Sequence, residues 1–547
     1  MRCIREACRR LALGDPEPYE KKLKVGLALA WLPLMSLILP SLIPMPAEGV
    51  ELVLTIALAI IPSCLIISGY MPVLKLRSHL SSLEHEAPFA ILMINVGVHA
   101  GLPPLRAFEE LAKLDVLKAI SFEVRRILRD SCLYRRHLSE QLAVEAKQAA
   151  GTWAKLLRAL VSLERIGGDP RLVLRDLMRE TLRDLRVHYE SLARRFQSMI
   201  SASNVLFGAM PMMLSVLFTL LASEAVISMV VGFMILNALM ATLYLMTVDM
   251  QIPRTTSFTR TYAKIVLRWL PLGIGLGLLA YMGFIRIPIS LIAPKAVAIS
   301  IGALAFSLPA YLEFRLHARV VDELLENLPT VLRDIADEVE RGFSPHQALE
   351  RLYENATYGK FTDRFIALLV KRARVLGSLR DALRGIEHLL PIQMRLSLWL
   401  LTLGEELGAS SGVYHGLADA MLEYYLALRS FKRGCQGYRL MALGMVALTI
   451  GLVITLFSTL VSRIAIVGQL VSSAEGLVSL PFSIASPELL PVIKDWVYAG
   501  VAVNSLILAL VTGKTLDWRI GGSFRDLIIV SIMLLGTLMI GLITGLL

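Results

Sequence analysis

The segment "VTGKTLDW", residues 511–518, contains the Gly-Lys-Thr triplet that ends a phosphate-binding loop. Such a loop also needs a glycine five positions before Gly513, and that position holds Leu508. It must also follow a β-strand, whereas this segment follows an apolar run of membrane-spanning type. We therefore expect no nucleotide site here, and we interpret Lys514 as a charge that helps to set membrane orientation.

Metal binding and covalent catalysis have equally little support. His85 stands between Glu84 and Glu86, but the HExxH pattern of a zinc site, with its two histidines one helical turn apart, is absent. No CxxC pair occurs, and no Ser/His/Asp or Cys/His set can be argued from spacing. The five cysteines are scattered: Cys3, Cys8, Cys64, Cys132 and Cys435. The sequence predicts no metal, no cofactor and no enzymatic activity.

Two groups of basic residues are the best candidates for a binding function. The first contains Arg125, Arg126, Arg129, Arg135 and Arg136, with Asp130 the only acid between Glu123 and Glu140. The second contains Lys371, Arg372 and Arg374, followed by Arg380 and Arg384, with Asp381 alone among them. Both groups fit docking of an acidic protein surface or of anionic lipid headgroups, and both also fit plain charge bias beside a membrane. Aromatic residues are not interleaved, so nucleic acid is a poor partner.

A third basic series has a different pattern. Arg171, Arg175, Arg179 and Arg183 recur every fourth residue and form one ridge of a predicted helix. Acids at Asp176, Glu180 and Asp184 form the neighbouring ridge. Pairs such as Asp176–Arg179 and Glu180–Arg183 lie three residues apart, which predicts a solvated face held by its own salt bridges.

The elements that must carry these residues follow from hydropathy. The chain has 547 residues, is 55% hydrophobic with a mean hydropathy of +0.63, and still contains 18% charged residues. Alternating membrane spans and polar helical domains explain both values. Nine runs are long enough to span: Val25–Met45, Leu52–Leu74, Ile200–Ala222, Val226–Thr247, Val266–Phe284, Ala293–Leu312, Leu440–Leu460, Trp496–Val511 and Leu527–Leu547.

Lysine and arginine placement predicts the orientation. The N-terminus and the short turn with Lys514, Arg519 and Arg525 are basic, which places both in the cytoplasm of a multi-pass protein of the cell membrane. The resulting divisions are a basic N-terminus (1–24), spans one and two (25–74), a first helical module (75–199), spans three to six (200–312), a second module (313–439), and spans seven to nine (440–547). The spans contain few acids or bases, which argues against ion-coupled transport.

The two modules read as a repeat with a constant shift of 241 residues. This shift places Pro88 on Pro329, Val98 on Val339, Gly101 on Gly342 and Pro104 on Pro345. Each glycine stands where a helix needs a left-handed residue after its end, and each proline suits the first turn of the next helix. Ser344 and Gln347 complete a capping box in the second copy, whereas Pro103 replaces that serine in the first. We expect an all-α polytopic membrane protein whose two units run in parallel.

Two pairs of stretches carry a family resemblance. These are "AGLPPLRAFEELA" (100–112) with "RGFSPHQALERL" (341–352), and "LERIGGDPRLVLRDL" (163–177) with "GEELGASSGVYHGLADAM" (404–421). They resemble the helix–Gly–x–x–Pro–helix signature and the later glycine turn of platform proteins of type II secretion and type IV pilus machines (the GspF/PilC/TadC group). The span number, the double module and the Asn- and Gln-poor composition are more similar to the archaeal branch, which serves archaella and adhesive pili.

The resemblance implies a non-enzymatic membrane core around which pilin or archaellin subunits assemble. It also implies a cytoplasmic hexameric secretion ATPase that pushes on the modules, contact with membrane lipids, and a homodimer. The alternative is a polytopic transporter with cytoplasmic regulatory helical domains. Large polar modules and an apolar membrane core favour the platform, whereas charges at the membrane midplane would favour the transporter.

Overall fold

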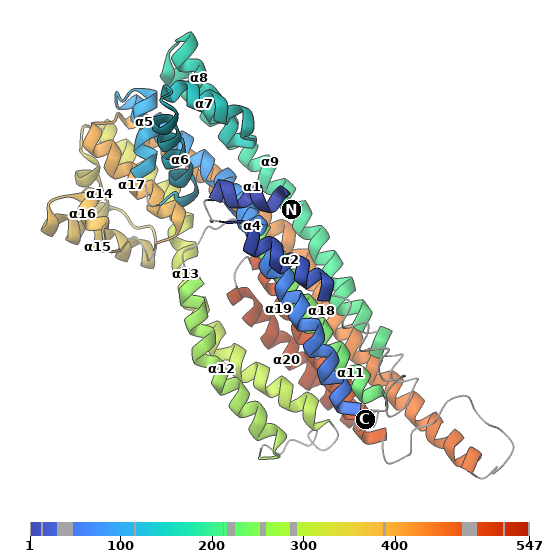
Figure 1. The fold of residues 1–547 in the computed structure, drawn as a ribbon. Coiled ribbons are helices and arrows are strands. Elements are labelled where there is room, and N and C mark those ends of the chain that lie inside the picture. The colour runs from blue at the N-terminus through green and yellow to red at the C-terminus, as the bar shows by residue number, and fades with distance from the viewer. Residues whose placement is uncertain are drawn as a thin grey trace.

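The structure is a computed structural model. It describes residues 2–11, 15–29, 48–113, 116–211, 213–215, 225–251, 259–284, 293–386, 390–472, 490–517 and 520–544. Every regular element in these ranges is a helix (Figure 1). An elongated bundle of long helices leads at one end into a wider body of shorter helices (Figure 1).

Seven helices in the described ranges are long and apolar enough to cross a membrane. They are Pro170–Ser215, Met229–Asp249, Ala263–Tyr281, Pro294–Glu340, Ser411–Leu456, Pro491–Asp517 and Gly521–Ile543. Each overlaps one of the predicted spans from the third to the ninth. The first two predicted spans, 25–45 and 52–74, fall largely on residues or side chains outside the description. The described residues therefore contain seven candidate spans, and the count of nine stays a prediction.

Four long helices continue from the apolar bundle into the polar body without a break. They are α4 (Glu48–His99), α9 (Pro170–Asn204), α13 (Pro294–Glu340) and α18 (Ser411–Ser472). A π-helical turn, Val205–Ala209, follows α9 where it enters the apolar region. The predicted divisions near residues 75, 200, 313 and 440 lie within or at the end of these helices. A displacement of the polar body would therefore be passed directly to the bundle.

Shorter helices complete the two modules. The first module contains α5 (Pro104–Glu110), the 3-10 turn η2 (Leu111–Lys113), α6 (Lys118–Tyr134), α7 (Leu138–Gln148) and α8 (Gly151–Ile166). The second contains α14 (Pro345–Asn355), α15 (Lys360–Leu376), α16 (Leu379–Leu383) and α17 (Ile392–Leu407).

The two modules are packed together and share one hydrophobic core. Tyr424 of α18 lies at their contact, where its ring is 5.8 Å from that of Tyr189 on α9 and 5.7 Å from that of Phe89 on α4. The Tyr424 hydroxyl also accepts a hydrogen bond from Gln393 Nε2 at 2.7 Å. Further along the same helices, Phe196 packs edge-on against Phe431 at 5.6 Å. Because the core is continuous, the modules form one body and not two separate arms.

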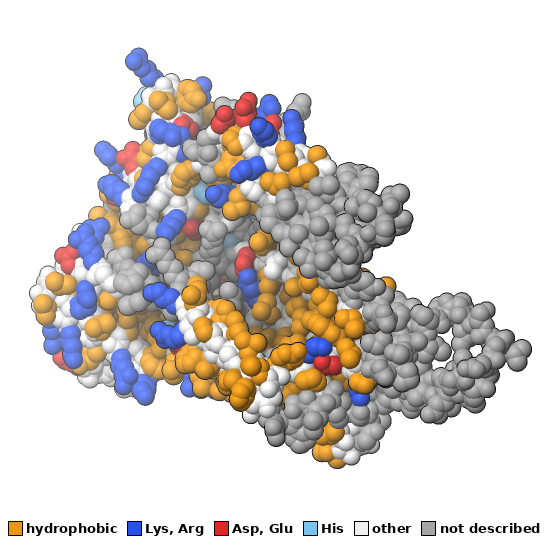
Figure 2. Space-filling view, turned by 60° about the horizontal axis from the view of Figure 1, so that its bottom comes forward, with side chains coloured by type: hydrophobic (Ala, Val, Ile, Leu, Met, Phe, Trp, Pro, Cys, Tyr) orange, Lys and Arg blue, Asp and Glu red, His pale blue; other side chains and the backbone are white. Residues whose placement is uncertain are grey.

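The apolar bundle has a core of its own, built from α11 (Ala225–Gln251), α12 (Thr259–Tyr281), α19 (Leu490–Asp517) and α20 (Ile520–Ile543) with the long helices. In the most apolar stretch of α19, 72% of the residues are buried, whereas in that of α12 only 17% are. Helix α19 is thus the centre of the bundle, and α12 lies at its edge beside α13 (Figure 1). Figure 2 shows hydrophobic side chains gathered over the bundle and basic side chains spread over the modules.

Two short helices at the N-terminus, α1 (Arg2–Leu11) and α2 (Glu17–Leu29), lie against α4. Ile4, Ala7 and Cys8 of α1 form a small separate core with Val73 of α4. Arg5 Nε donates to Glu20 Oε1 at 2.7 Å, which joins the two short helices.

Matching turns end α4 and α13. Gly101 and Gly342 both have a φ of +94°, in the region that favours glycine. The N–H groups of Leu102 and Phe343 donate to the carbonyls of Gly97 and Glu338, five residues back, at 2.9 and 3.2 Å. The capping box of Ser344 and Gln347 is present, whereas Pro103 makes no side-chain cap.

Replacing Gly342 by valine should therefore destabilise the protein by roughly 1 kcal/mol or more. A Cβ at this position would meet nothing within 4 Å, so the penalty is the positive φ itself. The thermal midpoint of the purified full chain measures the effect. Gly412→Val is the matched control, since a Cβ there also meets open space but φ is not positive. Equal midpoints for the two variants would contradict the turn assignment.

Candidate functional site

The Gly-Lys-Thr segment lies inside helix α19 and does not form a loop. Lys514 Nζ is 2.6 Å from Asp249 Oδ2 on α11, and Thr515 Oγ1 donates to the Val511 carbonyl at 2.6 Å. A Cβ on Gly513 would lie 2.4 Å from the Cα of Ser523, so this glycine lets α19 and α20 approach closely. The segment serves helix packing and offers no phosphate cradle.

The acids around His85 cap helices. Glu86 Oε2 accepts hydrogen bonds from the Ala119 and Ile120 N–H groups at the start of α6, at 2.9 and 3.0 Å. Burial raises the pKa of this carboxyl to about 7, against the effect of the two N–H donors. Glu84 Oε1 accepts from the Thr152 N–H of α8 at 2.8 Å. These carboxylates position the first module.

One set of side chains in the described ranges has ligand atoms close enough to share a metal ion: Asp337, Glu340 and His415, within 4.8 Å of one another. Both acids are exposed, and His415 Nε2 lies 3.6 Å from each carboxylate. Exposed groups of this kind are common at helix contacts without a metal, and these three side chains join α13 to α18.

The first basic group divides into anchored and exposed members. Arg126 Nη2 lies 2.8 Å from Glu123 and 2.7 Å from Glu145, so it ties α6 to α7. Arg125 Nε donates to the Ala112 carbonyl at 2.7 Å. Arg129, Arg135 and Arg136 are exposed, and Arg135 ends α6 with a φ of +51°. The structure therefore leaves three of the five residues as a possible contact surface.

The second basic group is more strongly paired within the protein. Arg374 Nε donates to Glu350 Oε1 of α14 at 2.7 Å, and Arg372 donates to the Arg384 carbonyl at 2.9 Å. Lys371 is exposed. The flanking residues are also paired, Arg380 with Glu406 at 2.9 Å and Arg384 with Asp381 at 3.0 Å.

The arginine ridge on α9 is not held by its own acids. Lys155 of α8 lies 2.6 Å from both Glu180 and Asp184, so these carboxylates face another helix. Arg171, Arg175, Arg179 and Arg183 are exposed. Among the described residues, no ion pair involves these four arginines. The ridge is consequently a second exposed basic surface and not a self-neutralised face.

Sequence reasoning missed a buried ionic cluster where the bundle meets the modules. Arg439 of α18 lies 2.6 Å from Asp517 at the end of α19 and 3.1 Å from Asp526 of α20. The side chains of Arg439 and Asp526 are 13% and 2% exposed. All three residues lie just outside the predicted spans, so the prediction that the spans themselves contain few acids or bases is not contradicted by this cluster. The residues are far apart in sequence, and only the folded chain shows their pairing.

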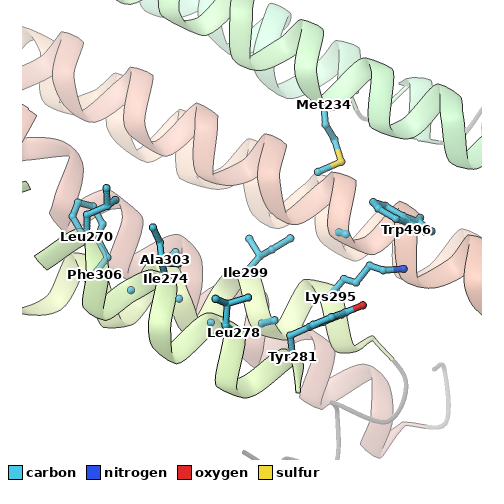
Figure 3. Close-up of a pocket in the computed structure, with 15 residues that line it drawn as sticks. Met234, Leu270, Ile274, Leu278, Tyr281, Lys295, Ile299, Ala303, Phe306 and Trp496 are labelled. Atoms are coloured by element: carbon cyan, nitrogen blue, oxygen red, sulfur yellow. The ribbon is translucent and has the colours of Figure 1, made fainter. Parts of the chain in front are cut away.

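A groove opens in the apolar bundle between α12, α13, α11 and α19 (Figure 3). Its volume is about 490 Å³. Ile274 and Leu278 of α12, Ile299 of α13 and Met234 of α11 point into it (Figure 3). Helices α12 and α13 come close together at the floor of the groove. Glycine at position 277 permits this, because a Cβ there would lie only 3.2 Å from the Ala298 carbonyl oxygen.

The only described charged residue that lines this groove is Lys295, at one end. Its Nζ lies 3.0 Å from Asp495 Oδ2 and 4.0 Å from the centroid of the Trp496 ring. The Lys295 charge is thus neutralised within the protein, and the rest of the lining is almost wholly apolar. Such a groove can accept an apolar helix or a lipid chain, and it carries no group placed for catalysis.

Residues 90–218 match the family model described as Type II secretion system (T2SS), protein F. The match covers about a quarter of the chain, from the end of α4 through the first module and into the third predicted span. The second module lies outside the matched residues. No curated protein and no solved structure is significantly similar to the chain.

Proposed function

The chain carries a type II secretion system protein F domain at residues 90–218, and from this premise we propose that it is the membrane platform of a filament-assembly machine. The family domain is the observation that carries the proposal, since that family comprises membrane platform proteins of secretion and pilus systems. The platform would be a multi-pass protein without enzymatic activity of its own.

The fold supports a force-coupling role. The matched domain includes the end of α4 and the whole of α9, two of the helices that continue from the modules into the apolar bundle. Because the modules share one core, a push on either would move the common body and the four long helices together. We propose that a cytoplasmic hexameric secretion ATPase supplies this push, and that pilin or archaellin subunits are the cargo.

We further propose that the second module is a parallel copy of the first. Helix starts support this reading, because α5 and α14 begin at Pro104 and Pro345, and α8 and α17 begin at Gly151 and Ile392. Both pairs keep the shift of 241 residues. With a basic N-terminus in the cytoplasm, both modules would face the ATPase, and a homodimer would present four of them. The archaeal branch, with an archaellum or adhesive pilus as product, is the specific assignment we favour.

Charge reversal of the exposed residues in the two basic groups tests whether the ATPase docks on them. Reversing Arg129, Arg135 and Arg136 to glutamate, together with Lys371→Glu, should abolish filaments while the protein still inserts in the membrane. Pull-down of the ATPase should also fall steeply with salt in the wild type, because exposed charges are screened over about 10 Å at 0.1 M ionic strength. Filament counts on cells and pull-down yields are the measurements.

The arginine ridge supplies a matched comparison. Arg171→Glu, Arg175→Glu and Arg179→Glu change exposed arginines on another helix. Loss of docking in this variant, with normal docking in the first, would show that the ATPase binds the ridge. If both variants dock and assemble normally, electrostatic docking on these modules is wrong.

The transporter alternative is favoured by one observation, the buried charges of Arg439 and Asp526. Asp526 lies near the start of α20, at the end of the bundle and not at its middle. A structural ion pair explains it more simply. Flux of solutes or ions through proteoliposomes, reduced by Asp526→Asn, would support the transporter instead.

A further inference from the structure

A second, polar cavity lies at the junction between the apolar bundle and the modules. Its volume is about 300 Å³. Helix α13 forms one wall and α18 another, and the end of α19 and the start of α20 complete it. The cavity is separate from the apolar groove, with which it shares no lining residue.

The lining of this cavity is strongly basic. Five cationic side chains line it: Arg315, Arg319, Lys432, Arg439 and Arg525. Two carboxylates, Asp322 and Asp517, also line it. Asp526, behind the wall, neutralises part of the Arg439 charge. Even with that acid included, positive charge remains in excess by two among the described residues.

Part of this charge is already paired. Arg439 contacts Asp517 and Asp526, and Lys432 Nζ lies 3.5 Å from Asp322. Arg315, Arg319 and Arg525 take part in no ion pair among the described residues. Arg315 stacks over the Tyr311 ring, with its guanidinium carbon 5.9 Å from the ring centroid. All three arginines are exposed, so they can reach an anion at the cavity mouth.

The start of α20 adds to the positive potential. This helix begins at Ile520, and Gly522 and Arg525 of its first two turns line the cavity. Free N–H groups at a helix start carry a partial positive charge that favours anions. A Cβ on Gly521 would lie 2.0 Å from the Phe314 ring, so glycine is what lets this helix start reach α13.

The surroundings of the cavity are those of a lipid headgroup. On α13, Leu308 and Leu312 just before the cavity are 47% and 54% exposed, as expected for side chains that face lipid tails. Arg315 and Arg319 follow within two turns, where the helix passes into the polar body. Tyr311 lies one turn before Arg315, and aromatic residues are enriched at the membrane interface. A ligand here can place an anion on the arginines and an apolar chain on the leucines.

We propose that this cavity binds the phosphate group of an anionic phospholipid from the membrane leaflet on the side of the modules. The phosphate would accept hydrogen bonds from Arg315, Arg319 and Arg525, and the acyl chains would lie along α13. Because these arginines come from α13 and α20, the lipid would join the helix that leads into the second module to the last helix of the bundle. The proposal is independent of the filament-platform function.

The test uses the purified full chain in detergent, with native mass spectrometry of bound phosphatidylglycerol and phosphatidylcholine. The wild type should retain phosphatidylglycerol at least about tenfold more strongly, since each basic residue near a membrane surface favours anionic lipid. The triple variant Arg315→Gln, Arg319→Gln and Arg525→Gln should lose this preference. Its helicity by circular dichroism and its melting midpoint in phosphatidylcholine should match the wild type.

The control removes the same number of exposed arginines elsewhere, with Arg171→Gln, Arg175→Gln and Arg179→Gln, and should keep the wild-type preference. Inorganic phosphate is the second arm. If it displaces phosphatidylglycerol at similar concentration, the site takes a soluble phosphate and the lipid assignment is wrong. Equal loss in both triple variants would show only general charge attraction, and an unchanged preference in the first variant would exclude this cavity.

Discussion

Replacing Tyr424 by alanine is expected to destabilise the protein by about 3–5 kcal/mol, the range for removing a large buried aromatic ring. Tyr424 is 5% exposed and contacts both modules. Its loss removes the ring contacts with Tyr189 and Phe89 and leaves Gln393 Nε2 without the hydroxyl that it binds. The thermal midpoint of the purified full chain and its resistance to proteolysis measure the effect.

Two further variants separate the effect of losing the Tyr424 ring from that of losing its hydroxyl. Tyr424→Phe keeps the ring and loses the hydroxyl, so about 1–3 kcal/mol should be lost, the range for leaving a buried polar partner unsatisfied. Tyr353→Ala is the exposed control at 40% exposure and should change little. If Tyr424→Ala is as mild as Tyr353→Ala, the two modules do not depend on a common core for their stability.

Replacing Arg439 by methionine should also destabilise the protein by about 3–5 kcal/mol, because it leaves a buried charge uncompensated. Asp526 is 2% exposed, and Arg439 is the cation that contacts it at 3.1 Å. Arg439 Nη2 also binds Asp517 at 2.6 Å, so its loss frees the end of α19 from α18. The melting midpoint in detergent is the measurement.

A double substitution tests the mechanism of this effect. Adding Asp526→Asn to Arg439→Met removes the orphaned carboxylate and should recover a large part of the lost stability. Arg433→Met, on the same helix and exposed, is the matched control and should stay within about 0.5 kcal/mol of the wild type. A double variant no more stable than Arg439→Met would show that packing and not charge dominates at this cluster.

Together these two contacts describe how the polar body is joined to the bundle. Tyr424 holds the modules to each other, and Arg439, fifteen residues further along α18, holds that helix to α19 and α20. Both lie on one continuous helix, so a displacement of the modules would reach the last two helices of the bundle. The basic cavity lies at the same junction, so the proposed lipid would stiffen it.

Local signals in the sequence predicted much of the architecture. Seven candidate spans could be predicted from hydropathy, because a run of about 20 apolar residues is the length that a helix needs to cross a bilayer. The turns at Gly101 and Gly342 were readable because a left-handed residue after a helix is nearly always glycine. The "AGLPPLRAFEELA" stretch pointed to the family whose model matches residues 90–218.

Pairing between distant residues could not be read in this way. Charge counting in the window around Arg126 found one acid, Asp130, yet Arg126 pairs with two others. Glu123 lies three residues earlier on the same helix, and the turn between α6 and α7 brings in Glu145, which spacing along the sequence could not show. The ridge on α9 has its acids at helical spacing, but Lys155 of α8 occupies Glu180 and Asp184. Spacing along one helix gives the possible partners, and a neighbouring helix decides between them.

The sequence by itself determined the helical class, the alternation of apolar and polar helices, and the glycine turns, since each depends on residues within a few turns of one another. Tertiary structure alone decided that the modules share a core around Tyr424, that Arg439 and Asp526 form a buried pair, and that Arg315, Arg319 and Arg525 meet at one cavity. These features join residues that are far apart in sequence, 87 residues for Arg439 and Asp526 and 235 for Tyr189 and Tyr424. Hydrophobic burial determines which helices pack together, but it is not directional and does not specify pairs of polar groups. Which polar groups meet therefore depends on the packing geometry of the folded chain.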